Sequence, residues 1–455
     1  MMFTNIAKEI QMMEIRTIGR ETFFPSTSFF RILRAMKYSK LNMPILYVQK
    51  YINLFSVACF WILLSLIVFS RNLGYSQLNS NPFKEYTHKK KKLMLGSERF
   101  DLYIDSLINK RVAIVGNQTS VIGNTHLVDT LLSLGITIDR VFSPEHGFRG
   151  NADNGEKVEN EKDVKTGLEI VSLYGNNRKP SKAQLENIDL ILFDIQDVGT
   201  RFYTYISSLH LIMEACAEKG ISMIVLDRPN PNAHYIDGPI LEPKHKSFIG
   251  MHPVPIVYGM TIGEYARMIN NEYWLKDSMK CNLYVVPCKY YSHKMPYTIR
   301  IPPSPNLRSQ LAVCFYPTLC LFEGTTVSIG RGTDMPFEVY GHPKFPESDF
   351  QFTPKPGVGS KKPPNEGKLC YGVDLKLLGL PELTQLNLDW IIEAKSLLGD
   401  SNVFFDQPSF FDRLAGTSKL REQIMNKTPE EEIRLSWEEG IEKFKRIRRK
   451  HLLYD

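Results

Sequence analysis

Residues 141–150, with the sequence VFSPEHGFRG, place a glutamate and a histidine side by side. The apolar run before them predicts a strand that stops at Pro144, so Glu145 and His146 stand where the strand ends. Two neighbouring titratable side chains in such a place suit general acid/base chemistry. A surface turn with an ordinary glutamate and histidine is the alternative interpretation of this stretch taken alone.

Three more predicted strands end in polar residues. The apolar runs at 111–116, 189–195 and 221–226 each stop at a turn-forming segment, and stretches with helical spacing lie between the strands. Apolar strands that alternate with helices predict an α/β fold, a Rossmann-like doubly wound parallel sheet domain followed by a smaller α/β domain. Ligands bind beyond the carboxyl ends of the strands in such sheets. The candidate substrate ligands at these ends are Asn117, Gln118, Asp194, Gln196, Asp227, Arg228 and Asn230.

A sheet edge rich in carboxylates and aromatic rings suits glycoside cleavage. In that reaction one carboxylic acid protonates the leaving oxygen, and a second group serves water or the sugar. Glu145 is the candidate acid, because its apolar neighbours Phe142 and Phe148 should raise its pKa. The other catalytic candidates are His146, in a supporting role, Asp197 and Tyr203, and further substrate-binding candidates are Arg149, Arg201, Tyr205, Arg331 and Asp334. Packing roles for the tyrosines, and an Arg331–Asp334 pair that only orders its loop, remain open alternatives.

Other classes of function find less support. The first strand–helix turn, GNQTSVIG at 116–123, matches neither the dinucleotide fingerprint nor the P-loop, so we expect no nucleotide cofactor. The histidines are scattered and the seven cysteines lack zinc spacing, so we expect no metal site. No G-x-S-x-G motif occurs. The net charge of +7 is mild and no basic groove with interleaved aromatics is evident, so nucleic-acid binding is not expected.

The amino-terminal segment is predicted to carry a targeting signal. The uncharged run LFSVACFWILLSLIVF at 54–69 is shorter than the roughly 20 apolar residues of a typical spanning helix. With small residues at Gly74 and Ser76, it predicts a secretory signal at 43–76 that is cut before Gln77. An uncleaved membrane anchor through 54–69 is the alternative. Both place the folded part outside the cytoplasm, periplasmic or secreted, while 1–42 is an extension without evident folding role and 77–95 is a Lys-rich tether.

A proline-rich stretch, IPPSPNL at 301–307, marks the predicted domain boundary, because residues that precede proline are held extended. We therefore expect a catalytic domain at 96–303 and a C-terminal α/β domain at 304–455. In the first of these, TIGE at 261–264 fits a capping box. Glu264 is accordingly expected to cap a helix rather than to take part in catalysis.

Six motifs, taken in order, resemble those of one known family. They are GNQTS at 116–120, SPEHGFRG at 143–150, DIQDVGTRFYTY at 194–205, LDRPNPN at 226–232, PPSPNL at 302–307 and FEGTTVSIGRGTDMPFE at 322–338. This set is similar to the NamZ-type exo-β-N-acetylmuramidases of glycoside hydrolase family 171, over roughly residues 96–455. The order of the six motifs makes the resemblance specific.

The resemblance implies a Rossmann-like domain with a smaller α/β domain, in an extracytoplasmic enzyme of peptidoglycan turnover. Such an enzyme removes N-acetylmuramic acid from the non-reducing end of peptidoglycan-derived glycans or muropeptides, and the glutamate of its EHG motif, here Glu145, is the catalytic residue. The lactyl carboxylate of the sugar needs a cation, for which Arg149, Arg201 and Arg331 are candidates. A non-catalytic cell-wall glycan-binding protein on the same frame is the alternative function.

Overall fold

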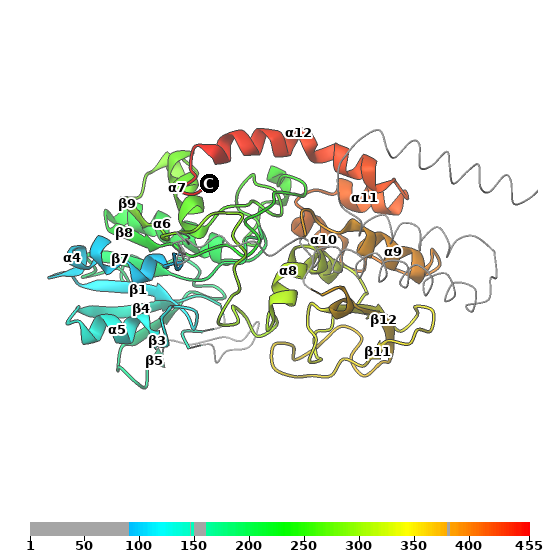
Figure 1. The fold of residues 1–455 in the computed structure, drawn as a ribbon, viewed down its shortest axis with the longest axis horizontal. Coiled ribbons are helices and arrows are strands. Elements are labelled where there is room, and N and C mark those ends of the chain that lie inside the picture. Colours follow the sequence, from blue (N-terminus) through cyan, green and yellow to red (C-terminus); the bar gives the residue numbers. More distant parts are fainter. Residues whose placement is uncertain (1–90, 146, 150–160, 380–382) are drawn as a thin grey trace, which may run out of the picture. The chain divides into compact units, whose positions relative to one another are not determined.

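A mostly parallel β-sheet organises the first part of the computed structural model, which describes residues 91–145, 147–149, 161–379 and 383–455 (Figure 1). Its seven strands lie in the order β5-β6-β4-β1-β7-β8-β9, and all except the edge strand β5 are parallel. Taken by their place in the chain, the parallel strands have the order 3-2-1-4-5-6 of a Rossmann-like sheet. The strands are β1 (Val112–Gly116), β4 (Ile138–Ser143), β5 (Glu161–Lys162), β6 (Glu169–Ser172), β7 (Leu190–Asp194), β8 (Ser222–Leu226) and β9 (Leu283–Val286).

The sequence prediction of a Rossmann-like parallel sheet is confirmed, and four of its strands lie within one residue of their predicted bounds. Strands β6 and β9 were not predicted. β6 lies in a charged stretch and has only four residues, so its apolar pattern is short. A small hairpin of β2 (Val121–Ile122) and β3 (Thr125–His126) follows β1.

Helices cover both faces of the sheet because alternate strand residues point to opposite sides. Val112 and Ile114 pack with the core on the side of α4 (Ile104–Leu107) and α5 (Leu127–Ser133). Ala113 and Val115 pack with the core on the side of α6 and α7. These helices span α6 (Tyr205–Lys219) and α7 (Ile262–Asn271), and short 3-10 turns lie at η1 (Gly96–Glu98), η2 (Phe100–Leu102), η3 (Pro243–His245) and η4 (Lys276–Ser278). As expected, Thr261 and Glu264 form a capping box at the start of α7.

The C-terminal part is a smaller arrangement of helices and a three-stranded antiparallel sheet, in the order β10-β12-β11. Its apolar side chains, such as Phe315 and Trp390, belong to the same buried cluster as α6 and α7. The elements are α8 (Gln310–Leu319), η5 (Cys320–Gly324), β10 (Val339–His342), β11 (Gln351–Phe352), β12 (Cys370–Asp374), η6 (Leu375–Leu378), α9 (Leu388–Leu398), α10 (Pro408–Ala415), α11 (Lys419–Met425) and α12 (Glu430–Arg449). The α/β class predicted for this part is confirmed, while the boundary at 303/304 stays a prediction.

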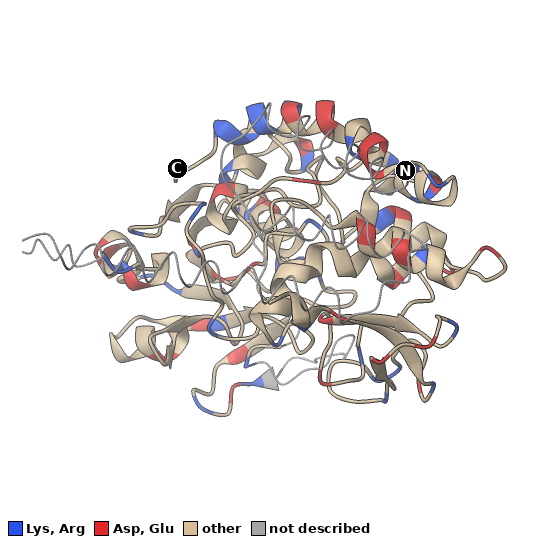
Figure 2. Cartoon of the chain, turned by 45° about the vertical axis from the view of Figure 1, so that its right-hand side comes forward, with Lys and Arg blue, Asp and Glu red and all other residues tan. Residues whose placement is uncertain are grey.

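The last helix, α12, fastens the C-terminal part to the first. Its first turn is acidic and its last turn basic, as the helix dipole favours (Figure 2). Trp437 Nε1 donates to Asp237 Oδ1 at 3.2 Å, and Arg448 Nε donates to the carbonyl of Gly259 at 2.9 Å. These contacts, 200 and 189 residues apart in the chain, hold the loops that follow β8.

Within the described ranges, no helix is long and apolar enough to cross a membrane. The predicted signal or anchor at 43–76 lies outside those ranges. Among the described residues the cysteines are free, and no group of three or more His, Cys, Asp or Glu side chains is placed to hold a metal ion.

Candidate functional site

Glu145 stands at the carboxyl end of β4, two residues beyond the last strand residue Ser143. Gly147, two positions further on, has a φ of 78°, which a glycine adopts without strain. The Glu145 side chain is half-buried, and Thr204 Oγ1 donates to its Oε2 at 3.3 Å. Because Thr204 immediately precedes α6, the carboxyl group faces the amino-terminal end of that helix.

Burial is the main influence on Glu145 and raises its pKa. Hydrogen bonds from Thr204 and Tyr174, and the positive charges of Arg331 and Arg178, act in the opposite direction. Burial outweighs them, so the carboxyl group keeps its proton to a higher pH than an exposed glutamate does. This is the property required of a group that donates a proton near neutral pH.

The point where the strand order reverses lies between β1 and β7, and Asn117 and Gln118 follow β1 there. Asn117 Nδ2 donates to the hydroxyl of Tyr205 at 2.9 Å, and that hydroxyl donates to the carbonyl of Pro303 at 3.1 Å. Gln118 Nε2 donates to the carbonyl of Pro302 at 3.0 Å. The buried Oε1 of Gln118 has no hydrogen-bond partner among the described residues.

Asp197, in the loop after β7, is a second buried carboxyl group at this edge. Its Oδ2 accepts hydrogen bonds from Tyr258 and from the backbone N–H of Gly199, the latter at 2.6 Å. Its Oδ1 has no partner in the described part of the chain. Burial raises the pKa of Asp197 to about 6, against the opposing hydrogen bonds from Tyr258 and Gly199. Burial also raises the pKa of Tyr205, and the charges of Glu145 and Asp197 both add to this rise, so the two carboxyl groups share Tyr205 as a neighbour.

Two candidate substrate ligands, Asp194 and Arg228, instead bind each other. Arg228 Nε and Nη2 donate to the two carboxylate oxygens of Asp194 at 2.5 and 2.8 Å. Both side chains are buried. This bidentate pair ties the end of β7 to the end of β8, and we assign both residues to the framework of the site.

Asp227 and Asn230 also serve the framework. Asp227 accepts from Thr261 Oγ1, the Gly263 N–H and the Tyr454 hydroxyl at 2.7, 2.8 and 2.6 Å, so it joins β8 to the start of α7 and to the chain's last residues. Burial raises its pKa to about 7, against the hydrogen bond from Tyr454. Asn230 Nδ2 donates to the carbonyl of Met260 at 2.8 Å.

The structure also removes two arginines from the candidate cations. Arg201 is completely buried, and its guanidinium donates to the carbonyls of Pro239, Val254 and Leu414 at 2.7–2.9 Å. Burial lowers its pKa to about 9. Arg149 donates to both carboxylate oxygens of Asp163 at 2.7 Å and also to Asp129. Neither side chain is available to a substrate carboxylate in this arrangement.

The remaining candidates lie as follows. Gln196 Nε2 donates to the carbonyl of Pro229 at 2.8 Å, and Tyr203 packs edge-on against Tyr205 with ring centroids 4.9 Å apart. Arg331 Nε donates to Glu323 Oε1 at 2.7 Å, so its loop is ordered by Glu323 and not by Asp334, which is exposed. His146 lies outside the described residues.

Four contributors to the site were missed in the sequence. Tyr174 and Arg178 follow the unpredicted strand β6, and Tyr258 lies in the long connection between β8 and α7. Thr204 lies inside the RFYTY motif and directly precedes α6. The sequence instead suggested Thr200 as the residue that begins this helix.

The strand order and the half-buried carboxyl group at the sheet's carboxyl edge define a Rossmann-like α/β protein with a candidate acid–base site. Residues 112–311 match the family model for the N-terminal part of the exo-β-N-acetylmuramidase NamZ, and residues 314–454 match that for its C-terminal part. The chain belongs to the NamZ family.

Individual relatives match this chain over most of its length. The peptidoglycan β-N-acetylmuramidase NamZ of Bacillus subtilis is 39% identical over 394 residues, which cover 82% of this chain and 94% of that one. Two crystal structures of DUF1343 family proteins from Bacteroides fragilis are similar in fold. One is 45% identical with a TM-score of 0.74, the other 29% identical with a TM-score of 0.68, and each match covers 80% of this chain and 99% of the other.

Proposed function

We propose that this protein is a glycoside hydrolase that releases N-acetylmuramic acid from the non-reducing end of peptidoglycan fragments. The observation that carries the proposal is Glu145, a half-buried carboxyl group of raised pKa at the carboxyl edge of the sheet. The name of the Bacillus subtilis relative, a peptidoglycan β-N-acetylmuramidase, supplies the substrate class. Protonated Glu145 donates to the glycosidic oxygen as the bond to the leaving group breaks.

Asp197 is the proposed second group. Its pKa of about 6 leaves it largely ionised at neutral pH, as a base or an electrostatic stabiliser must be. Its Oδ1 has no hydrogen-bond partner among the described residues. His146, Gln118, Gln196 and Tyr203 are proposed to position the substrate or water. Tyr205 is proposed to act through Asn117, to which it is hydrogen-bonded.

A chromogenic β-N-acetylmuramide tests this function directly. The proposal expects release of the chromophore by the wild-type protein, and a loss of roughly 10²–10⁴-fold in kcat/KM of Glu145→Gln on an N-acetylmuramyl disaccharide, while that variant should still fold and bind the sugar. Glu347→Gln, at an exposed position far along the chain, is the matched control and should keep full activity. Saturable binding of the sugar by the wild-type protein without any turnover would instead identify a cell-wall glycan-binding protein.

We infer that the folded part works outside the cytoplasm, where peptidoglycan is. The apolar run at 54–69 supports this, as a cleaved signal or as an anchor. Amino-terminal sequencing of the protein from the secreted or periplasmic fraction should find Gln77 first. An intact amino terminus in the membrane fraction would favour the anchor, and intact protein confined to the cytosol would contradict both.

A further inference from the structure

N-acetylmuramic acid differs from N-acetylglucosamine by a lactyl ether that ends in a carboxylate. An enzyme that selects the first sugar needs a cation for that carboxylate, and guanidinium groups suit it because they bind it through two parallel hydrogen bonds. The useful cation is one that has no carboxylate partner within the protein. The need for such a cation rests on the proposed function.

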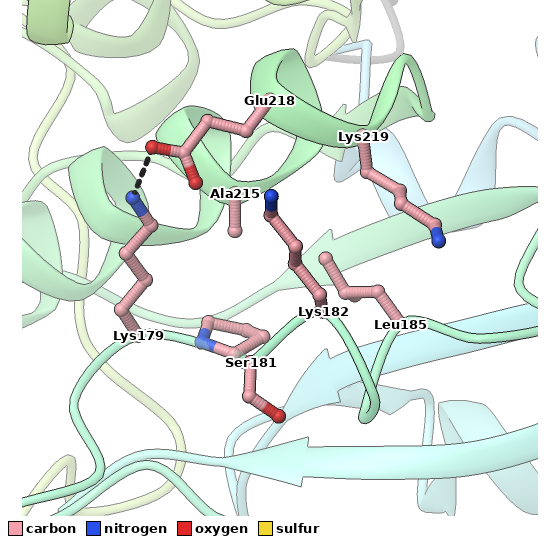
Figure 3. Close-up of a pocket in the computed structure, with 8 residues that line it drawn as sticks. Lys179, Ser181, Lys182, Leu185, Ala215, Glu218 and Lys219 are labelled. Carbon is pink, nitrogen blue, oxygen red and sulfur yellow. Dashed lines mark hydrogen bonds and ion pairs between the residues drawn. The ribbon is translucent and has the colours of Figure 1, made fainter.

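Most basic side chains around the sheet edge already have such partners. Arg149 pairs with Asp163, Arg228 pairs with Asp194, and Arg331 pairs with Glu323. Lys179, which lines a pocket of about 250 Å³ beside α6, pairs with Glu214 and Glu218 at 2.6 and 2.8 Å (Figure 3). The carboxylate partners neutralise the positive charge of these side chains in the absence of substrate.

Arg178 is different. It is exposed, and within the described ranges its guanidinium has neither a hydrogen-bond acceptor nor a carboxylate partner. It lies instead over the ring of Phe248, with the guanidinium carbon 4.2 Å from the ring centroid. A guanidinium stacked in this way is held in place while its N–H groups at the edge stay free to bind an anion.

Hydrogen bonds to the backbone order the two loops that carry Arg178 and Phe248. Phe248 lies in a tight turn where Ser247 and Gly250 exchange two backbone hydrogen bonds of 2.9 and 3.0 Å. The Arg178 loop is closed at its base by Asn177 Nδ2, which donates to the carbonyl of Ser172 at 2.8 Å. Arg178 is therefore positioned before any ligand binds, which limits the entropy lost on binding.

The loop of Arg178 begins next to Glu145. Ser172, at the end of β6, is paired with Ser143, at the end of β4, and Leu173 N–H donates to the Ser143 carbonyl at 2.7 Å. Glu145 and Arg178 therefore emerge from neighbouring strand ends on the same edge. The positive charge of Arg178 is one of the influences on the carboxyl group of Glu145, which places the two within electrostatic reach.

We propose that Arg178, stacked on Phe248, binds the lactyl carboxylate of the substrate and so selects N-acetylmuramic acid over neutral N-acetylhexosamines. The sugar bound beside Glu145 would then direct its 3-O-lactyl group toward the loop after β6. Arg178 is a specificity residue in this account and takes no part in proton transfer.

The test compares two inhibitors, free N-acetylmuramic acid and its neutral methyl ester, measured against the chromogenic β-N-acetylmuramide. The wild-type protein should bind the acid at least about tenfold more tightly than the ester, as a charge-assisted pair predicts. Arg178→Met should reduce that preference to within about twofold by weakening the acid alone. Phe248→Leu should reduce the preference for the acid in part, because it keeps the guanidinium of Arg178 but removes the aromatic ring on which it stacks.

Lys182→Met, at another exposed basic residue of the same connection, is the matched control and should keep the wild-type preference. The proposal is overturned if the wild-type protein does not discriminate, if Arg178→Met keeps the preference, or if Arg178→Met weakens acid and ester equally. A preference lost in Arg331→Met but kept in Arg178→Met would assign the role to Arg331 instead. Failure of the proposed function would show differently, as absence of chromophore release by the wild-type protein.

Discussion

Thr204 Oγ1 donates to Oε2 of Glu145 at 3.3 Å, from the residue that immediately precedes α6. Thr204 makes no side-chain cap bond to its own helix. Its hydroxyl can therefore be removed with little effect on the start of α6, and the consequence should appear in the titration of Glu145.

Thr204→Val removes a donor that favours the ionised form of Glu145, so the pKa of Glu145 should rise. If Glu145 acts as an acid, activity is lost as pH rises through that pKa, and the alkaline limb of kcat/KM should move to higher pH. A pH–rate profile measures this. Ser207→Ala, which removes another buried hydroxyl near the start of α6, should leave the limb in place. If the alkaline limb of Thr204→Val is unchanged or moves to lower pH, Glu145 is not the acid.

Breaking the Asp194–Arg228 pair should cost stability, because both groups are buried. Removal of one partner of a buried ion pair typically costs about 3–5 kcal/mol. We expect Arg228→Met to show a loss of this order in urea unfolding, and the double variant with Asp194→Leu to lose less than the two single variants added together. An Arg228→Met protein of wild-type stability with weakened sugar binding would restore Arg228 as a substrate ligand.

Asp197 should make the protein less stable as pH rises. Its pKa is about 6 in the folded protein against an ordinary 3.8, so the folded state holds a proton that the unfolded chain has released. The stabilisation is present at low pH and is lost between about pH 4 and 6; the full rise in pKa corresponds to roughly 3 kcal/mol. Asp197→Asn cannot titrate. The free energy of unfolding of the wild type minus that of the variant should fall over this range, and a difference that is flat or rises would refute the assignment.

Arg201 should behave as an interior residue. Arg201→Met removes the guanidinium donor from the buried carbonyls of Pro239 and Leu414, and one of the two donors to the carbonyl of Val254, which keeps the Leu241 N–H. A buried carbonyl left without a donor costs about 1–3 kcal/mol. Thermal unfolding should show a large loss, whereas Arg413→Met, at an exposed guanidinium on α10, should change little. A stable Arg201→Met protein with a raised KM would show instead that the guanidinium reaches the substrate.

The local apolar pattern predicts the strands, but which polar side chains pair with each other depends on contacts between distant parts of the chain. The strands that precede Asn117, Glu145 and Asp197 could be predicted because buried parallel strands are continuous apolar runs. The apolar pattern could not show that Arg228 and Asp194 would form an ion pair with each other, because each is simply a polar residue at the end of a predicted strand. Arg201 looked available for the same reason, although the carbonyls that bind it come from residues up to 213 positions away.

The missed residues have a related explanation. Arg178 and Tyr174 follow β6, whose four residues lie within a charged stretch. Phe248, which holds Arg178, comes from the connection after β8, 70 residues further along the chain. Contacts between loops at one sheet edge depend on which strands are neighbours, and β6, the neighbour of β4, was absent from the predicted strands.

The most direct test of Glu145 as proton donor compares two leaving groups in the variant Glu145→Gln. The second sugar of an N-acetylmuramyl disaccharide is a poor leaving group, because its hydroxyl oxygen must be protonated by the general acid as the bond breaks. Dinitrophenolate is a good leaving group and needs little protonation. If Glu145 is the proton donor, kcat/KM of the variant should fall roughly 10²–10⁴-fold on the disaccharide and far less on the dinitrophenyl glycoside. Equal losses on both substrates, or full activity on the disaccharide, would contradict that role.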